Sequence, residues 1–307
     1  MGSRRADIAT LEARHAARGV LGVGIVIELH AMMQVFAVLF GLAVGSFLNV
    51  CIARMPEDRS VVRPASHCPA CGQTIRPYDN IPVVSWVLLR ARCRDCGVSI
   101  SPLYPMIEAM TGILFWLIFL RFVPTGEALT PAGAVAFVGM AAFAAMMVAM
   151  TFIDLRHYII PDEFSIYAVP VGLAFAWGHH ALGGTHPVWA EGLRSGLLGA
   201  ALGGGSLALV MGVYWVVRRE EGMGMGDVKL LALMGAFFGA APAIPFIIIV
   251  ASFAGACVGL PLVLIGNRGL RVAMPFGPFL AFAALLYMLH GPELIARFFP
   301  GVAFILQ

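Results

Sequence analysis

The sequence predicts an all-α polytopic membrane protein with about eight transmembrane helices and a small cytoplasmic loop domain. Hydrophobic residues make up 60% of the 307 residues and charged residues only 12%, whereas soluble domains carry about a quarter charged residues. The mean hydropathy is +0.88. Apolar runs of about 20 residues, the length that crosses a bilayer, recur from residue 31 almost to the C-terminus. One N-terminal signal segment cannot explain this pattern, so we expect the chain to lie in the lipid bilayer.

The apolar runs divide the chain into four parts. A tail of residues 1–30 precedes a first transmembrane helix at 31–53, and residues 54–102, rich in Arg, Pro and Cys, are the only stretch that predicts a soluble domain. Residues 103–307 then form the transmembrane core. We expect spans at approximately 31–53, 103–122, 132–153, 164–183, 194–217, 227–241, 244–265 and 273–290.

The distribution of arginine predicts the orientation. If the loops after the first, third, fifth and seventh spans are cytoplasmic, they hold twelve arginines, and outside the N-terminal tail only Arg121, Arg194 and Arg297 remain on the opposite side. This positive-inside bias orients both termini toward the periplasm. The net charge of +3 is too small and too scattered for a nucleic-acid surface, so we expect no nucleic-acid partner.

The N-terminal tail departs from this bias. It carries Arg4, Arg5, Arg14 and Arg18, which oppose a periplasmic N-terminus. Either the tail is a short amphipathic interfacial helix without a catalytic role, or it is not native and the true start is Met32 or Met33.

The loop of residues 54–102 contains two C-x-x-C pairs, Cys68-Pro-Ala-Cys71-Gly and Cys93-Arg-Asp-Cys96-Gly, separated by 21 residues. Two such turns can supply the four thiolates of a tetrahedral Zn²⁺ site. The alternative is a pair of disulfides or a redox pair, but the topology puts this loop in a reducing compartment. Four protein ligands leave no open position for water, so we expect a structural Zn²⁺ that folds the loop.

Acidic side chains inside a membrane are costly and usually serve function, and this chain has few. Asp154 ends the third span, Asp162 follows eight residues later, and Asp227 begins the sixth span in Gly224-Met225-Gly226-Asp227. That span is short and Gly-rich, as is typical of helices that line a cavity. The topology puts all three acids on the cytoplasmic side, where they can meet.

Two neighbouring carboxylates cannot easily both ionise, so one holds a proton while the other takes one from water. This is the chemistry of an aspartic protease, and we assign it to Asp154 and Asp227. Without side chains, Gly224 and Gly226 let a substrate backbone approach; Lys229 and Glu108 are further candidates for lining the site.

Purely structural roles are the alternative for each acid. Asp154 would then pair with Arg156 at the interface, Asp162 would cap a helix after Pro161, and Asp227 would cap its own helix and pair with Lys229. The Asp162 capping role is the one we prefer for that residue.

The assembled motifs resemble the type IV prepilin peptidase family, also called prepilin leader peptidase/N-methyltransferase. The similarity extends over most of the chain in consistent order. It comprises Gly45-Ser46-Phe47-Leu48-Asn49-Val50 with Arg54 and Pro56, Arg63-Pro64 before Cys68 and Cys71, Ile81-Pro82-Val83-Val84-Ser85-Trp86, Tyr104-Pro105 with Glu108 and Thr111-Gly112, Asp154 to Asp162, Gly224 to Lys229, and Pro275-Phe276-Gly277-Pro278.

The resemblance implies two reactions. Acids matching Asp154 and Asp227 cut a pilin or type II secretion pseudopilin precursor after a glycine, and the enzyme then methylates the new amino terminus with S-adenosylmethionine. Methylation is associated with the cysteine loop; the sequence identifies no residues that bind the donor. The chain has Leu103 where the family often has Arg, and Ala109 where a larger residue is common.

Two other classes remain open. A single-activity, preflagellin-like peptidase would cleave without methylation, although the intact four-cysteine loop argues against it. A non-enzymatic transporter would use its acids to bind ions near the midplane, whereas here they lie at the cytoplasmic boundary and no repeat relates the two halves. The oligomeric state is not predicted.

Overall fold

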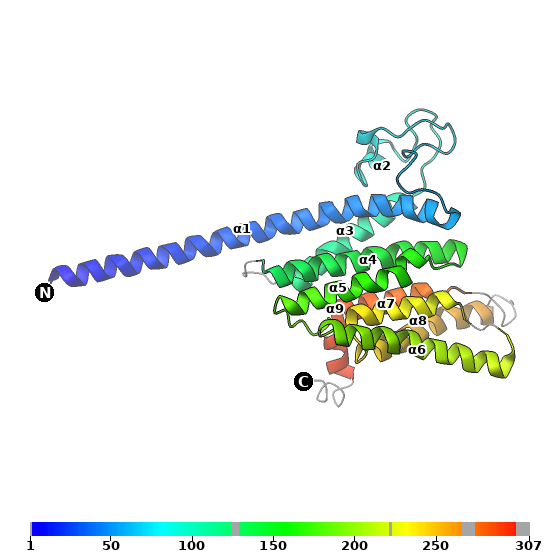
Figure 1. Cartoon of the computed structure of the whole chain (residues 1–307). Coiled ribbons are helices and arrows are strands. Elements are labelled where there is room, and N and C mark those ends of the chain that lie inside the picture. The colour runs from blue at the N-terminus through cyan, green and yellow to red at the C-terminus, as the bar shows by residue number, and fades with distance from the viewer. Residues whose placement is uncertain (1, 124–128, 221–222, 266–273, 299–307) are drawn as a thin grey trace.

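The computed structural model describes residues 2–123, 129–220, 223–265 and 274–298 (Figure 1). This part of the chain is helical, with two isolated β-bridges and no strand. The elements, in order, are α1 (Gly2–Arg54), η1 (Met55–Glu57), η2 (Pro77–Asp79), α2 (Val84–Leu88), α3 (Leu103–Phe122), α4 (Pro131–His157), η3 (Asp162–Phe164), η4 (Ile166–Ala168), α5 (Val169–Ala181), α6 (Gly192–Arg218), α7 (Met225–Phe238), α8 (Ala243–Ile265) and α9 (Gly277–Phe298).

The helical bundle confirms the polytopic fold class. Each of the eight expected spans corresponds to one of the helices α1 and α3 to α9. By length and apolar composition, six of the described helices can cross a membrane, namely those in α1, α3, α4, α6, α8 and α9. The remaining two, α5 and α7, are only 13 and 14 residues long.

The expected transmembrane span at 164–183 was wrong in its start and length, because α5 covers only Val169–Ala181. Residues 162–168 form the two short turns η3 and η4, and α5 begins only at Val169, with Pro170 in its first turn. Proline is well suited to that position, because the first helical N–H groups have no partner within the helix. The chain between Asp154 and α5 therefore runs as a folded connection at the end of α4, not as a transmembrane helix.

Helix α1 extends past the rest of the bundle (Figure 1). It is continuous from Gly2 to Arg54, so no break marks the boundary that we expected between residues 30 and 31. The side chains of Arg4, Arg5, Arg14 and Arg18 lie outside the described residues. From His30 onward α1 is packed on α3: His30 is buried and its ring lies 5.1 Å from that of Phe119.

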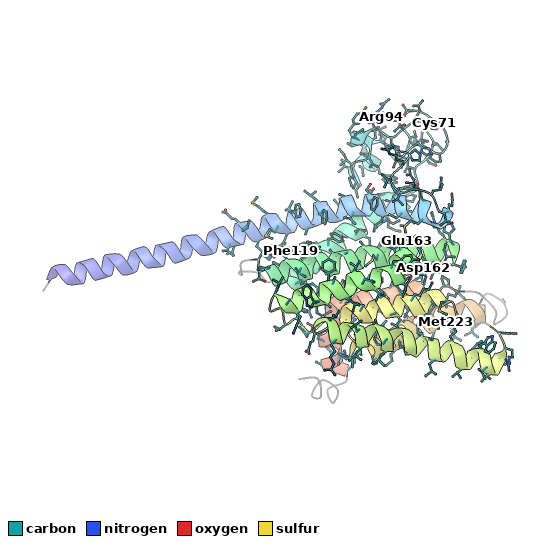
Figure 2. The ribbon with its side chains drawn as sticks, viewed as in Figure 1. Cys71, Arg94, Phe119, Asp162, Glu163 and Met223 are labelled. Carbon is teal, nitrogen blue, oxygen red and sulfur yellow. The ribbon has the colours of Figure 1, made fainter. Side chains whose placement is uncertain are left out.

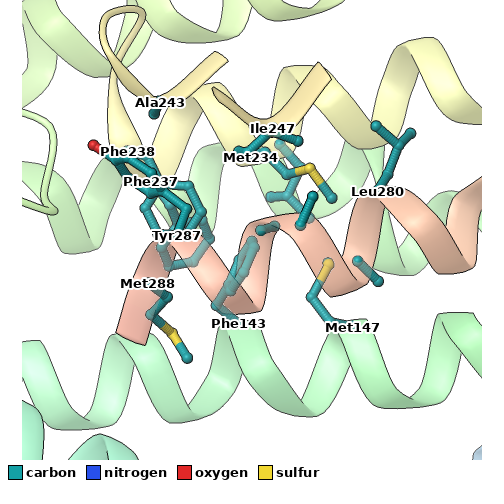
Figure 3. Close-up of a cluster of buried hydrophobic side chains, with 14 of the residues drawn as sticks. Phe143, Met147, Met234, Phe237, Phe238, Ala243, Ile247, Leu280, Tyr287 and Met288 are labelled. Atoms are coloured by element: carbon teal, nitrogen blue, oxygen red, sulfur yellow. The ribbon is translucent and has the colours of Figure 1, made fainter. Parts of the chain in front are cut away.

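The core centres on α7, which is buried nearly all round by α4, α6, α8 and α9. Its last two residues pack on aromatic side chains of two neighbouring helices (Figure 3). The ring of Phe143 in α4 lies 5.0 Å from Phe237 and 4.9 Å from Phe238, and Tyr287 in α9 lies 5.4 Å from Phe238. A helix that is apolar on most sides is typical of such a buried position.

Close contact between α6 and α7 depends on glycine. A Cβ atom added to Gly199 in α6 would collide with the carbonyl of Gly235 in α7, and the reverse substitution would collide with Gly199. Small residues at such crossings let two backbones approach, which is a common way to pack helices in membranes. The contact fixes α7 along its length and hence the position of its first turn.

Residues 55–102, which we call the four-cysteine loop, stand beside the C-terminal end of α1 (Figure 1). The loop contains η1, η2 and α2 and is otherwise irregular. Its only buried residues are Cys68 and Ser85. A segment with so little buried surface needs another source of stability, such as a bound metal or polar contacts.

Candidate active site and metal centre

Asp154 and Asp227 lie at the same depth in the bundle. Asp154 follows Phe143 by 11 residues in α4, and Asp227 precedes Phe238 by 11 residues in α7. Because Phe143 and Phe238 are in contact and a helix rises about 1.5 Å per residue, both acids lie about 16 Å from that contact. Their side chains are only 5% and 7% exposed, and the charge of one acts on the other. The structure therefore brings together the two acids that the sequence singled out.

The first turn of α9 covers Asp154. Gly277 opens α9, and its backbone amide faces the Asp154 carboxylate. A Cβ atom added to Gly277 would lie 2.5 Å from Asp154 Oδ2, so no side chain fits here. The stretch Pro275 to Pro278 was noted in the sequence without a role, and the structure makes it one wall of the site.

The connection after α4 packs on the glycine motif before Asp227. A Cβ atom added to Gly226 would lie 2.9 Å from the Cβ of Ile160, whereas one added to Gly224 would meet no atom closer than 3.9 Å. Gly226 therefore serves close packing, and Gly224, which is exposed, leaves open space at the start of α7. Nothing in the sequence pointed to Ile160 beyond its place between Asp154 and Asp162.

Lys229 pairs with Asp162, not with Asp227. Its Nζ donates to Asp162 Oδ1 at 2.7 Å, and both side chains are partly exposed. Pro161 is the N-cap of η3 and Asp162 is its first residue, with its carboxylate bound to Lys229, so the capping role expected for Asp162 is wrong. Among the described residues Asp154 makes no ion pair with Arg156. Among the described residues, Asp154 and Asp227 thus lack the ion-pair partners that a purely structural role would give them.

Glu108 contacts other segments of the chain than Lys229 does. It is buried in α3, where its Oε2 accepts a hydrogen bond from the backbone N–H of Val83 at 2.7 Å and its carboxylate also contacts Ser46 of α1. These partners belong to α1 and the four-cysteine loop. None of them belongs to the segments around Asp154 and Asp227.

The four cysteines form a cluster that could hold a metal ion. The sulfur atoms of Cys68, Cys71, Cys93 and Cys96 all lie within 4.8 Å of one another, as one tetrahedral ion requires. The two halves have the same geometry: the N–H of Gly72 donates to the Cys68 carbonyl at 2.9 Å, and that of Gly97 to the Cys93 carbonyl at 2.9 Å. Both glycines have a φ of +72°, which side-chain-bearing residues rarely adopt.

The four thiols differ in their local electrostatics. Backbone N–H groups of Cys71 and Ala70 directed at the Cys68 sulfur lower the pKa of that thiol to about 7. At Cys96 the backbone N–H of Val98 lowers the pKa, but burial and hydrogen bonds with the other three thiols outweigh it and raise the pKa to about 12. Thiolates, not thiols, bind metal ions. Cys51 and Cys257 lie outside the cluster, Cys51 buried in α1 and Cys257 exposed on α8.

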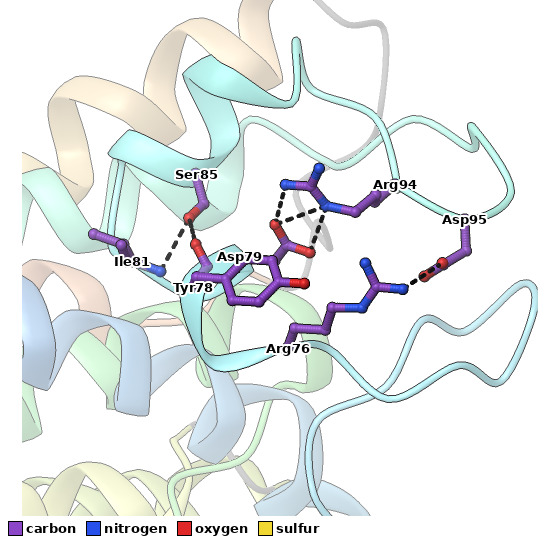
Figure 4. Close-up of polar contacts among 7 residues, drawn as sticks. All are labelled: Arg76, Tyr78, Asp79, Ile81, Ser85, Arg94 and Asp95. Atoms are coloured by element: carbon purple, nitrogen blue, oxygen red, sulfur yellow. Dashed lines mark hydrogen bonds and ion pairs between the residues drawn. The ribbon is translucent and has the colours of Figure 1, made fainter.

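Ion pairs tie the second cysteine pair to the segment before it (Figure 4). Arg94 binds both oxygens of Asp79, at 2.5 to 3.0 Å, and Arg76 lies 3.4 Å from Asp95. Hydrogen bonds from the Arg94 guanidinium hold the pKa of Asp79 below its usual value. The turn between Cys93 and Cys96 is therefore held from two sides without any hydrophobic core.

The four-cysteine loop lies toward the same end of the bundle as the acids. In Figure 2, Cys71 and Arg94 of the loop, together with Asp162, Glu163 and Met223, lie toward one end, and Phe119 lies toward the other. The fold and its site thus define a multi-pass membrane protein with a buried pair of acids and, at the same end, a loop whose four cysteines could hold a metal ion.

Comparison with known proteins identifies its family. Residues 39–122 match the Bacterial Peptidase A24 N-terminal domain, and residues 140–260 match the Type IV leader peptidase family. The chain belongs to this family, which confirms the resemblance found in the sequence. No solved structure matches the chain.

Curated relatives carry consistent names. The chain is 40% identical over 237 residues to the Prepilin leader peptidase/N-methyltransferase of Myxococcus xanthus, covering 77% of this chain and 65% of that protein. It is 34% identical to a protein of the same name from Burkholderia pseudomallei, covering 81% and 83% of the two chains. It is also 35% identical to the Type 4 prepilin-like proteins leader peptide-processing enzyme of Escherichia coli, covering 83% and 93%.

Proposed function

We propose that this protein is an intramembrane aspartyl endopeptidase that cleaves the leader of type IV prepilins or type II secretion pseudopilins after glycine. The observation that carries the proposal is the pairing of Asp154 and Asp227, two buried acids at equal depth on α4 and α7. The names of the relatives support the substrate class. A buried pair of acids without cationic partners is suited to sharing one proton.

The cleavage reaction needs two carboxyl groups and a water molecule. One carboxylate, ionised, takes a proton from water as the water attacks the scissile carbonyl, and the other, protonated, donates to that carbonyl oxygen. The amine then leaves with a proton returned from the pair, and no covalent intermediate forms. Asp227 lies in the first turn of α7, and the open space at Gly224 admits an extended peptide backbone beside it. Gly226 and Lys229 complete this side of the site.

The second reaction is methylation of the new amino terminus, with S-adenosylmethionine as the donor. The relatives' names, which include N-methyltransferase, support it. We assign no residues to the donor. The four-cysteine loop serves this step, and a Zn²⁺ held by Cys68, Cys71, Cys93 and Cys96 stabilises the loop without taking part in hydrolysis, since four protein ligands leave no place for water.

The enzyme acts from the cytoplasmic face of a bacterial inner membrane. The arginine-rich loop and the acids lie toward the same end of the bundle, and arginine accumulates on the cytoplasmic side of membrane proteins. Reporters fused near residues 80, 158 and 222 should be cytoplasmic, and those near 126 and 188 periplasmic. A reversed result at both 158 and 222 would contradict this orientation.

One assay tests both reactions. Purified protein is incubated with a pilin precursor, with or without S-adenosylmethionine, and the product mass is measured. Loss of the leader plus a gain of one methyl group supports the whole proposal. Cleavage without methylation in the presence of the donor would favour the preflagellin-like alternative, and absence of cleavage by folded protein would favour a transporter.

A further inference from the structure

One hydrogen bond joins the middle of the four-cysteine loop to the membrane helices. The backbone N–H of Val83, directly before α2, donates to Glu108 Oε2 at 2.7 Å. Glu108 lies in the second turn of α3 and is only 8% exposed. A buried carboxylate that accepts a backbone N–H makes a short, charge-assisted contact.

Helix α1 holds the Glu108 carboxylate in place. The Ser46 hydroxyl contacts the carboxylate, and a Cβ atom added to Gly45 would lie 2.7 Å from the Glu108 Cα. One turn away, the Asn49 side-chain amide donates to the Tyr104 carbonyl at 3.2 Å. Contacts between α1 and α3 therefore fix the Glu108 carboxylate independently of the four-cysteine loop.

Val83 adopts a backbone conformation that needs such a partner. Its φ is +61° and its ψ is −49°, a region that β-branched residues rarely occupy. Conformations of this kind persist only where surrounding contacts enforce them. The Glu108 hydrogen bond is one such contact, and the turn of Ile81 to Ser85, closed by the Ile81 N–H to Ser85 Oγ bond at 3.1 Å, is another.

The same segment carries the second cysteine pair. Trp86 Nε1 donates to the Ile100 carbonyl at 3.1 Å, and Asp79 binds Arg94 between Cys93 and Cys96. The loop has almost no buried core, so these polar contacts largely define its shape. A shift of Val83 would consequently move the turns that carry the cysteines.

We propose that Glu108 is a positioning residue that docks the four-cysteine loop onto α1 and α3 through Val83, and that methyl transfer depends on this contact whereas cleavage does not. The part of this proposal that concerns methyl transfer rests on the proposed function. Glu108 acts here only as a hydrogen-bond acceptor, and no proton moves. In the described part of the chain its hydrogen-bond partners are Val83 and Ser46, and no hydrogen bond joins it to Asp154 or Asp227, so we separate it from the peptidase site.

The test compares Glu108→Gln with Glu108→Ala in purified full-length protein. A glutamine side-chain carbonyl still accepts the Val83 N–H, but alanine cannot. We expect Glu108→Ala to speed amide hydrogen exchange in residues 81–86 about tenfold, as loss of a charge-assisted hydrogen bond should. It should also reduce methylation severalfold while cleavage remains near wild type, and Glu108→Gln should match wild type in all three measurements.

Three results would overturn the proposal. The first is unchanged exchange in residues 81–86 of Glu108→Ala, which would mean that the contact does not dock the loop. The second is equal loss of cleavage in both variants, which would mean that the carboxylate itself takes part in the chemistry. The third is loss of methylation in Glu108→Gln alongside normal exchange. Glu163→Gln, on the exposed η3 turn, is the matched control.

Exchange does not require an active enzyme, so it tests docking even if the wild-type protein fails to methylate. Failure of the wild-type protein to methylate would contradict the proposed methyltransferase activity, but hydrogen exchange would still show whether Glu108 docks the loop. If Glu108→Ala does not fold, Glu108→Gln still distinguishes the two roles. A glutamine side chain can accept the Val83 hydrogen bond but cannot act as an acid or base, so normal activity of Glu108→Gln supports the role of hydrogen-bond acceptor.

Discussion

Lys229 Nζ lies 2.7 Å from Asp162 Oδ1, which joins the first turn of α7 to the connection that follows α4. Each partner is close in sequence to one of the paired acids: Lys229 follows Asp227 by two residues, and Asp162 follows Asp154 by eight. The ion pair therefore spans the two segments that carry the proposed dyad. Among the described residues the ion pair of Lys229 is with Asp162 and not with Asp227.

We expect this ion pair to adjust the site without being essential. Both side chains are partly exposed, and such pairs contribute about 0–1 kcal/mol, so Asp162→Asn should keep substantial cleavage activity. Asp162→Lys, which faces Lys229 with a like charge, should be worse. Combining it with Lys229→Asp should restore activity, with a coupling energy on the order of 1 kcal/mol in a double-mutant cycle of kcat/KM.

Glu163→Lys is the control for that cycle, because it makes the same change of charge at the neighbouring exposed position, which has no ion pair among the described residues. Strictly additive effects of Asp162→Lys and Lys229→Asp would show that the pair does not matter to the enzyme.

Gly277→Ala should strongly reduce cleavage. The added methyl group would lie 2.5 Å from Asp154 Oδ2, so either the carboxylate or the start of α9 has to move. Displacement of a catalytic group by about 1 Å can cost on the order of 100-fold in rate. Precursor turnover at equal protein concentration measures the effect.

Gly255→Ala in α8 is the matched control, because its new Cβ would meet only Phe279, at 3.6 Å, an ordinary contact distance. Normal turnover by Gly277→Ala would mean that α9 does not confine Asp154 as the structure indicates.

Purified enzyme should contain about one Zn²⁺ per chain, as a closed four-thiolate site requires. Cys68→Ser or Cys96→Ser should lower the zinc content and increase proteolysis within residues 55–102, whereas Cys257→Ser, outside the cluster, should change neither. Elemental analysis and limited proteolysis provide the measurements. Metal-free protein with four reduced thiols and an intact loop would contradict a structural zinc.

The sequence predicted the parts of this protein that depend on local pattern. Apolar runs located the helices, and the spacing of Cys68, Cys71, Cys93 and Cys96 predicted the cluster, because two C-x-x-C turns have a nearly fixed geometry. The boundary between helix and turn near α5 was wrong, since apolar composition alone does not distinguish a span from the turns η3 and η4.

Pairings between distant segments were not predictable in the same way. Lys229 is two residues from Asp227 and 67 from Asp162, yet its partner is Asp162. Sequence proximity favoured the wrong acid, because successive helical residues point in different directions. The contact of Gly277 with Asp154 likewise arises only when α9 packs on α4. A single sequence shows which residues are costly to bury but not which of them meet.

Asp154→Asn and Asp227→Asn should each abolish cleavage while the protein remains folded and inserted. Asparagine keeps the size and polarity of aspartate but can neither accept nor deliver the catalytic proton, and loss of such a group costs about 10²–10⁴ in rate. Because the two acids act as one unit, the double variant should be no slower than either single variant. The pH profile of the wild type should be bell-shaped, with both limbs belonging to the pair and to neither residue alone. Turnover of a pilin precursor by detergent-purified variants at equal concentration is the measurement. If Asp154→Asn cleaves normally and Asp162→Asn does not, the first acid is Asp162 and the two-acid mechanism stands; if Asp227→Asn cleaves normally, the mechanism is wrong.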